Sequence, residues 1–217
     1  MNIVRFIKKD KNIIAISILI GLIATVVSAF CTKTYSDTIQ NGIANEVIRF
    51  HVLANSDSKE DQELKIKVRD SILNEYKEEL SACENIYQTK KVINDNLEKI
   101  AECAERTIKN EGYDYNVKAS LSVDKFPTKK YGDVVFPAGD YTALRIEIGE
   151  AKGRNWWCVM FPPLCFVDIT HNEIPENDKQ QLKNILTEEE YSIISSAEND
   201  TSIPVKIKFK IVELWQS

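Results

Sequence analysis

The sequence predicts an α+β protein in which an N-terminal signal or anchor helix precedes an αα-hairpin packed on a largely antiparallel sheet. Three observations support this prediction. An uncharged apolar run occupies residues 13–30, apolar residues recur at helical spacing over 58–109, and apolar and polar residues alternate in much of the second half. Because the predicted strands and helices are grouped and do not strictly alternate, a mostly antiparallel sheet is favoured over a parallel one.

The N-terminal segment has the composition of an export signal. Four basic residues, against one acid, precede the 18 uncharged residues of Ile13–Phe30. As a helix rising ~1.5 Å per residue, this run spans roughly 27 Å, close to the thickness of a bilayer core. The basic flank stays in the cytoplasm and directs the rest across the membrane. We therefore divide the chain into residues 1–31, a signal peptide or signal anchor, and residues 32–217, an exported α+β domain.

Removal of this segment is not decided by the sequence. Val27-Ser28-Ala29 has the small-residue spacing of a signal-peptidase site, yet the apolar run is longer than a typical signal-peptide core. Cleaved and anchored forms both stay open. Cys31 does not indicate a lipoprotein, because Phe30 is too bulky for the position before a lipidated cysteine.

Two helices are expected to form the hairpin. Ser58 is a favourable N-cap for the first, with Asp61 at the capping-box position. The second helix is expected over residues 86–109, with Gly112 suited to its C-terminal end, and the chain reverses near residues 81–83.

Strands dominate the second half of the chain. Alternating patterns predict strands over 115–123, 142–148 and 205–211, and the run 156–161, apolar on both faces, predicts a central strand. Two short helices are expected, one after Pro175 and one capped by Thr187 with Glu190 at the capping-box position.

Charge restricts the partners. The chain has 28 basic and 33 acidic residues, and without residues 1–31 it has 24 and 32, a net charge of −8. This field argues against nucleic acid and against adhesion to anionic membrane surfaces. With 43% apolar and 28% charged residues, the exported part is expected to be a folded domain.

The sequence contains no recognisable catalytic or metal-binding pattern, and no cofactor is expected. The two histidines, His51 and His171, lie outside any spaced metal cluster. Ile48, Phe50 and Val52 alternate with polar residues and predict a short strand, and His51 lies on its opposite face. The nearby Ser56 and Ser58 are better explained as turn and cap residues. His51 is expected to be structural or at the surface.

The cysteines offer one disulfide candidate. Cys83 and Cys103 would lie roughly 25 Å apart by helical rise, too far for a bond. Cys158 and Cys165 flank a segment that can reverse at its two prolines, so they can approach each other. The alternative is a pair of buried free thiols.

Trp156 and Trp157 are adjacent in a predicted strand, so their side chains point to opposite faces. An exposed tryptophan here would be an anchor for a protein partner. Burial of both in the core is the simpler alternative. The apolar loop 126–141 is a second candidate recognition surface, although packing over the sheet explains its composition equally well.

Two blocks of the sequence resemble the stage II sporulation protein R family. The first block, residues 49–70, begins RFHVLANSDS and continues with EDQELKIKVRD, and the second block, residues 153–168, reads GRNWWCVMFPPLCFVD. The resemblance implies a non-enzymatic signal made in the forespore and exported across its membrane. It implies as partner a membrane-bound aspartic protease of the mother cell, which then cleaves the precursor of the early mother-cell sigma factor.

Within this reading, the residues expected to contact the partner are Trp156, Trp157, Arg49, His51 and Asp57. No nucleic acid is expected, and the membrane is contacted through residues 13–30 if they are not cleaved. The alternative function is an exported cell-envelope hydrolase or wall-binding module with an unrecognised site around Arg49, His51 and Asp57.

We predict that the apolar segment alone directs export. Residues 1–36 fused to a reporter active only outside the cytoplasm should give activity. Replacing Ile18 and Leu22 with Asp should abolish this activity, because each acid near the middle of the segment costs about 2.5–3.5 kcal/mol on insertion scales. A reporter that stays active after both changes would contradict the prediction.

Overall fold

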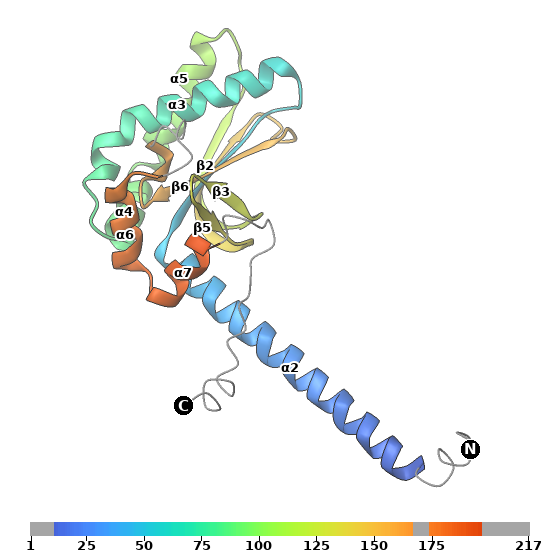
Figure 1. Ribbon diagram of the computed structural model, residues 1–217. Helices are drawn as coiled ribbons and strands as arrows, with labels where there is room; N and C mark the ends of the chain where they lie inside the picture. The colour runs from blue at the N-terminus through green and yellow to red at the C-terminus, as the bar shows by residue number, and fades with distance from the viewer. Residues whose placement is uncertain (1–10, 167–173, 197–217) are drawn as a thin grey trace. The chain divides into compact units, whose positions relative to one another are not determined.

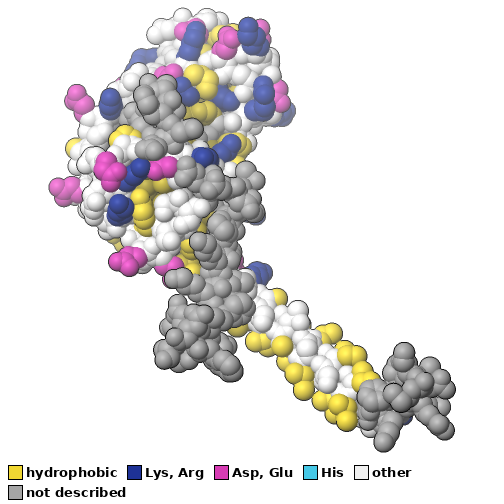
Figure 2. All heavy atoms as spheres, in the orientation of Figure 1, with side chains coloured by type: hydrophobic (Ala, Val, Ile, Leu, Met, Phe, Trp, Pro, Cys, Tyr) yellow, Lys and Arg dark blue, Asp and Glu magenta, His cyan; other side chains and the backbone are white. Residues whose placement is uncertain are grey.

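The computed structural model describes residues 11–166 and 174–196. Its internal contacts divide the described residues into two units, residues 11–39 and residues 40–166 with 174–196. The helix α2, Lys11–Glu46, begins in the first unit and exposes its apolar side chains between Ile13 and Phe30 (Figures 1 and 2). Among the described residues, α2 alone is long and apolar enough to cross a membrane, judged by length and composition. The predicted apolar helix is confirmed, and it continues past Cys31.

In the second unit, four strands form one sheet in the order β2-β5-β1-β6. They are β1 (Ile48–Leu53), β2 (Val117–Phe126), β5 (Gly139–Ile148) and β6 (Asn155–Phe161). The outer pairs, β2 with β5 and β1 with β6, are antiparallel, and the central pair of β1 and β5 is parallel. The predicted largely antiparallel sheet is therefore confirmed.

The position of β6 corrects one prediction. Its apolar residues predicted a central strand, but β6 lies at an edge of the sheet, and β1 is central with all six of its residues buried. The C-terminal half of β6, from Cys158 to Phe161, is nevertheless buried. The short 3-10 helix η1, Leu164–Phe166, folds back against β6 and supplies part of this cover.

Helices α3 (Lys59–Ser81), α4 (Ile86–Asp95) and α5 (Leu97–Asn110) cover one face of the sheet (Figure 1). Ser58 caps α3 as predicted, because its Oγ accepts a hydrogen bond of 3.1 Å from the Asp61 N–H. Gly112 follows α5 with φ +84°, and the N–H groups of Gly112 and Tyr113 bond back to the carbonyls of Lys109 and Ile108. These bonds form a Schellman motif, in which glycine is favoured.

The second predicted helix is in fact two. The chain breaks between α4 and α5 at Asn96, whose φ of −117° and ψ of 8° are not helical. The Asn96 side-chain amide donates to the Val92 carbonyl at 2.9 Å. Asparagine competes in this way with the main-chain bonds of a helix, which accounts for a break that the apolar spacing alone does not indicate.

The apolar loop 126–141 folds into a two-stranded ribbon. Its strands are β3 (Lys129–Tyr131) and β4 (Val134–Phe136), and their apolar side chains are buried. Two helices follow in the chain, α6 (Glu176–Ile185) and α7 (Glu188–Ser196). The predicted capping box of α7 is present, since Thr187 and Glu190 exchange hydrogen bonds of 2.8 and 3.3 Å. The predicted strand 205–211 and His171 lie outside the described residues.

A buried arginine joins the sheet to the ribbon. Arg49 is fully buried in β1. Its Nε donates to the Cys158 carbonyl of β6 at 3.1 Å, and its Nη2 donates to the Tyr131 hydroxyl of β3 at 3.0 Å. The guanidinium also lies over aromatic rings 4.5–5.4 Å away, which belong to β2, β5 and β4: Phe126, Tyr141 and Phe136.

This environment lacks a compensating acid, because Arg49 forms no ion pair within residues 11–166 and 174–196. Burial lowers the pKa of Arg49, and it raises the pKa of the neighbouring Tyr141 to about 12. Oxygen acceptors and aromatic faces therefore hold the charge.

A disulfide fixes η1 to β6. The structure joins Cys158 to Cys165, with Cα atoms 5.6 Å apart and seven residues of sequence separation. Cys83 and Cys103 are free thiols, as is Cys31. The bond closes a short loop around Pro162-Pro163, and both of its cysteines belong to the second sequence block.

We predict that Arg49 contributes to stability mainly through the volume that its side chain fills. Arg49→Ala should lower the free energy of unfolding by about 3–5 kcal/mol, because it leaves a cavity among six strands. Arg49→Met keeps most of the volume and removes the buried charge, so its loss should be below about 1.5 kcal/mol. Urea unfolding followed by circular dichroism measures both. Equal losses for the two variants would contradict the prediction.

We also predict that the disulfide stabilises the domain. Replacing Cys158 and Cys165 together by Ala should cost about 2.5 kcal/mol of unfolding free energy through loop-closure entropy. A reducing agent should destabilise the unmodified protein in the same urea assay and leave the double variant unchanged. Cys83→Ala, which removes a free thiol, is the matched control. A double variant as stable as this control would show that the bond adds nothing.

Candidate functional site

The two sequence blocks form adjacent strands of the sheet. β1 from the first block pairs with β6 from the second, with His51 opposite Trp157 and Val52 opposite Trp156. The candidate residues of both blocks thereby lie on two neighbouring strands and on the turn that follows β1. This arrangement makes the surface over β1, β6 and their connecting turns the candidate functional site.

The turns that follow β1 and precede β6 form a double loop, residues 54–58 with 149–155. The Gly153 N–H donates to the Ala54 carbonyl at 2.9 Å, and the Arg154 N–H donates to the Asp57 carboxylate at 2.6 Å. A Cβ atom at Gly153 would lie 2.1 Å from the Ser56 carbonyl oxygen, so only glycine permits this approach. The two turns are therefore positioned by each other.

Asp61 organises the first turn from inside. Its carboxylate accepts hydrogen bonds from Ser56 Oγ at 2.5 Å and from Asn55 Nδ2 at 2.9 Å. Burial acts to raise the pKa of Asp61, but these hydrogen bonds outweigh it and hold the pKa below its ordinary value. Asp61, which was predicted to complete a capping box, therefore accepts hydrogen bonds from the preceding turn. The Ser58 N–H, which a capping box would join to Asp61, donates to Ser56 Oγ.

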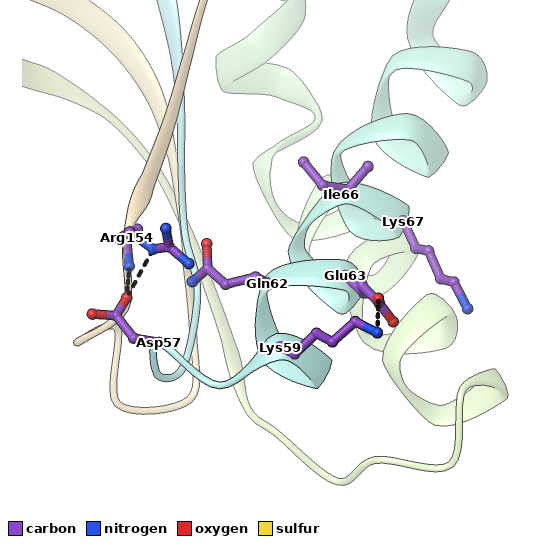
Figure 3. Close-up of a pocket in the computed structure, with 7 residues that line it drawn as sticks. All are labelled: Asp57, Lys59, Gln62, Glu63, Ile66, Lys67 and Arg154. Atoms are coloured by element: carbon purple, nitrogen blue, oxygen red, sulfur yellow. Dashed lines mark hydrogen bonds and ion pairs between the residues drawn. The ribbon is translucent and has the colours of Figure 1, made fainter.

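A pocket of about 540 Å³ lies beside the double loop and the start of α3 (Figure 3). Asp57 and Arg154 form an exposed ion pair at 3.6 Å on one side, and Lys59 pairs with Glu63 at 3.7 Å on the other. The remaining cation of the pocket, Lys67, pairs with Glu111. The charges of this pocket are thus matched within the protein.

His51 is buried on the face of β1 that carries Arg49. Its Nδ1 lies 2.5 Å from the Asp124 carboxylate, which also accepts a 3.1 Å bond from Arg145. The His51 ring stacks on Trp157 at 5.8 Å, and its Nε2 has no hydrogen-bond partner in the described part of the chain. Asp57 contacts Arg154, whereas His51 contacts Asp124 and Trp157, so the structure does not bring Arg49, His51 and Asp57 together into one reactive cluster.

Arg49 and His51 were both expected to contact the partner. In this structure neither side chain is available for direct contact, because Arg49 is 0% exposed and His51 is 4% exposed. Their role here is to support β6 and the ribbon from within. Asp57 is exposed, and its contact with a partner stays a prediction.

The two tryptophans are half-buried on opposite faces of β6. Trp156 meets the Phe50 ring edge-on at 5.8 Å, and the Arg69 guanidinium lies 4.7 Å from its ring. On the other face, the Lys129 ammonium lies 4.6 Å from the Trp157 ring. Neither side chain is wholly core or wholly surface, so each remains partly exposed.

The sequence did not indicate Asp124, Arg145 or Lys129 as members of this site. Asp124 and Arg145 lie at polar positions of strands in which apolar and polar residues alternate. This pattern predicts which face of the sheet carries a side chain, but it does not predict the residue that the side chain contacts. Lys129 lies in the region expected to be an irregular loop. Within the described ranges, no group of three His, Cys, Asp or Glu side chains could hold a metal ion.

Comparison with known proteins identifies the family. The sequence model described as stage II sporulation protein R matches residues 44–171, which include both blocks. Stage II sporulation protein R of Bacillus subtilis (strain 168) is 39% identical over 143 residues, covering 65% of this chain and 64% of that protein, slightly less than two thirds of its length. No solved structure matches. The chain belongs to the stage II sporulation protein R family.

Proposed function

We propose that this chain is an intercompartmental signal of endospore formation. A role in sporulation follows from the family, and the finer steps are our proposal. The chain is made in the forespore, and residues 13–30 carry the rest across its membrane. In the space between the two septal membranes, the exported domain binds a membrane-bound aspartic protease of the mother cell. The activated protease then processes the precursor of the early mother-cell sigma factor.

The observation that best supports this proposal is the assembly of both family-like blocks into one surface. β1 pairs with β6, and the double loop holds their turns together. This surface includes two partly exposed tryptophans, a residue type that is enriched among the residues that contribute most to protein binding. The exposed apolar stretch of α2 supports export or anchoring.

The proposed mechanism is binding without chemistry by this chain. A ligand shifts an enzyme between inactive and active states only by its higher affinity for the active one. The exported domain would therefore bind the active form of the protease more tightly than the inactive form.

Co-expression in a non-sporulating host tests this function. The shortened sigma factor should appear only when this chain, the protease and the precursor are all present. The Ile18→Asp, Leu22→Asp variant, which blocks export, should remove processing even though the domain itself is unchanged. The products are measured by immunoblot.

Two results would contradict the proposal. Processing that continues without this chain would show that the protease needs no such signal. Cleavage of the precursor by the purified chain, with no protease present, would show that the chain is itself an enzyme. A protease variant lacking its catalytic aspartate is the matched control for both.

A further inference from the structure

A second pocket, of about 500 Å³, lies along the outer side of β6. It is lined by residues 155–158 of β6, by β3 and by part of α3, with Leu164 and Cys165 of the η1 turn. The disulfide and the buried Leu164 fix this turn in place. The pocket therefore has a rigid apolar part, next to the indole rings of Trp156 and Trp157.

The charged groups around this pocket are mainly basic. Its lining includes Arg69, Lys129 and Lys130 against a single acid, Asp70, which pairs with Arg69. The exported part of the chain has a net charge of −8. The pocket is thus a local basic patch on an acidic domain.

The two lysines keep their charge available. The Lys129 ammonium is held over the Trp157 ring at 4.6 Å, and an aromatic face positions a cation without neutralising it. Neither Lys129 nor Lys130 has an ion-pair partner within residues 11–166 and 174–196. By contrast, the cations of the pocket in Figure 3 are each paired with an acid: Lys59 with Glu63, Lys67 with Glu111 and Arg154 with Asp57.

We propose that the β6 pocket binds an acidic peptide segment of a protein partner. A carboxylate of the segment pairs with Lys129 and Lys130, and a neighbouring apolar side chain packs against the exposed part of Trp156. The lysine over the indole is already ordered, so binding loses less side-chain entropy than it would with a free lysine. The inference rests on the proposed function in one respect, because it assigns this segment to the activated protease.

An anionic lipid surface is a poorer match for the same cations. A flat membrane would meet the whole negative domain, whereas a narrow segment meets the basic patch alone. The experiment therefore includes lipid as a separate arm.

The test uses the full chain in phosphatidylcholine nanodiscs and a fluorescein-labelled peptide of four Glu-Leu repeats. Fluorescence anisotropy should show binding that weakens as salt is added. The Lys129→Gln, Lys130→Gln variant should bind about tenfold more weakly, as expected for the loss of two charge pairs at the surface of the domain. The Lys59→Gln, Lys67→Gln variant removes the same charge elsewhere and should stay within about twofold of the unmodified chain.

Three results would overturn the inference. The two double variants could bind the Glu-Leu peptide equally well, or the unmodified chain could bind a Lys-Leu repeat peptide as tightly as the Glu-Leu peptide. Alternatively, the Lys129→Gln, Lys130→Gln variant could lose binding to phosphatidylglycerol vesicles and still bind the Glu-Leu peptide. The last would assign the patch to lipid. Failure of sigma-factor processing with peptide binding intact would instead overturn the proposed function and leave the pocket assignment standing.

Discussion

The guanidinium of Arg49 is the constraint on which the arrangement of the strands depends. A buried cation without a carboxylate is costly unless other groups replace its hydration. Here those groups come from five strands besides its own: the Cys158 carbonyl, the Tyr131 hydroxyl and the rings of Phe126, Phe136 and Tyr141. Displacement of any of these strands would remove part of this compensation, so the sheet and the ribbon are stabilised together.

The same constraint determines the external surface. The Tyr131 hydroxyl, which accepts a bond from Arg49, donates in turn to the Trp157 carbonyl at 3.1 Å. β3 is thereby held against β6, and Lys129, two residues before Tyr131, lies over the Trp157 ring. Residues of the first block thus act on the candidate surface from the interior, while Asp57 and the tryptophans form its accessible part.

Features that depend on neighbours in the sequence could be predicted. The Ser58 cap, the glycine after α5 and the Thr187–Glu190 capping box each involve hydrogen bonds that span no more than five residues. A short loop with two prolines likewise allowed Cys158 and Cys165 to be identified as a candidate pair. For such features, a local window of sequence contains every group that takes part.

Features that depend on distant groups could not be predicted in this way. The apolar pattern of β6 indicates burial on both faces, but it does not distinguish a central strand from an edge strand that η1 covers. Arg49 was expected to contact the partner as a residue of the first family-like block, and membership of that block does not show that the side chain is buried. Its hydrogen-bond partners lie 82 and 109 residues away in the sequence, and only the tertiary fold brings them to it.

Rigidity is the property that connects this architecture to the proposed signalling by binding. The double loop is fixed by Gly153 and Asp57, the η1 turn by a disulfide, and β6 by Arg49 from within. A surface ordered before contact loses little conformational entropy when it binds, so more of its interaction energy remains to favour one state of a partner. This matters for a domain that activates an enzyme by binding its active state more tightly than its inactive state. Binding free energy that is used to order the domain itself cannot contribute to the difference in affinity between these two states.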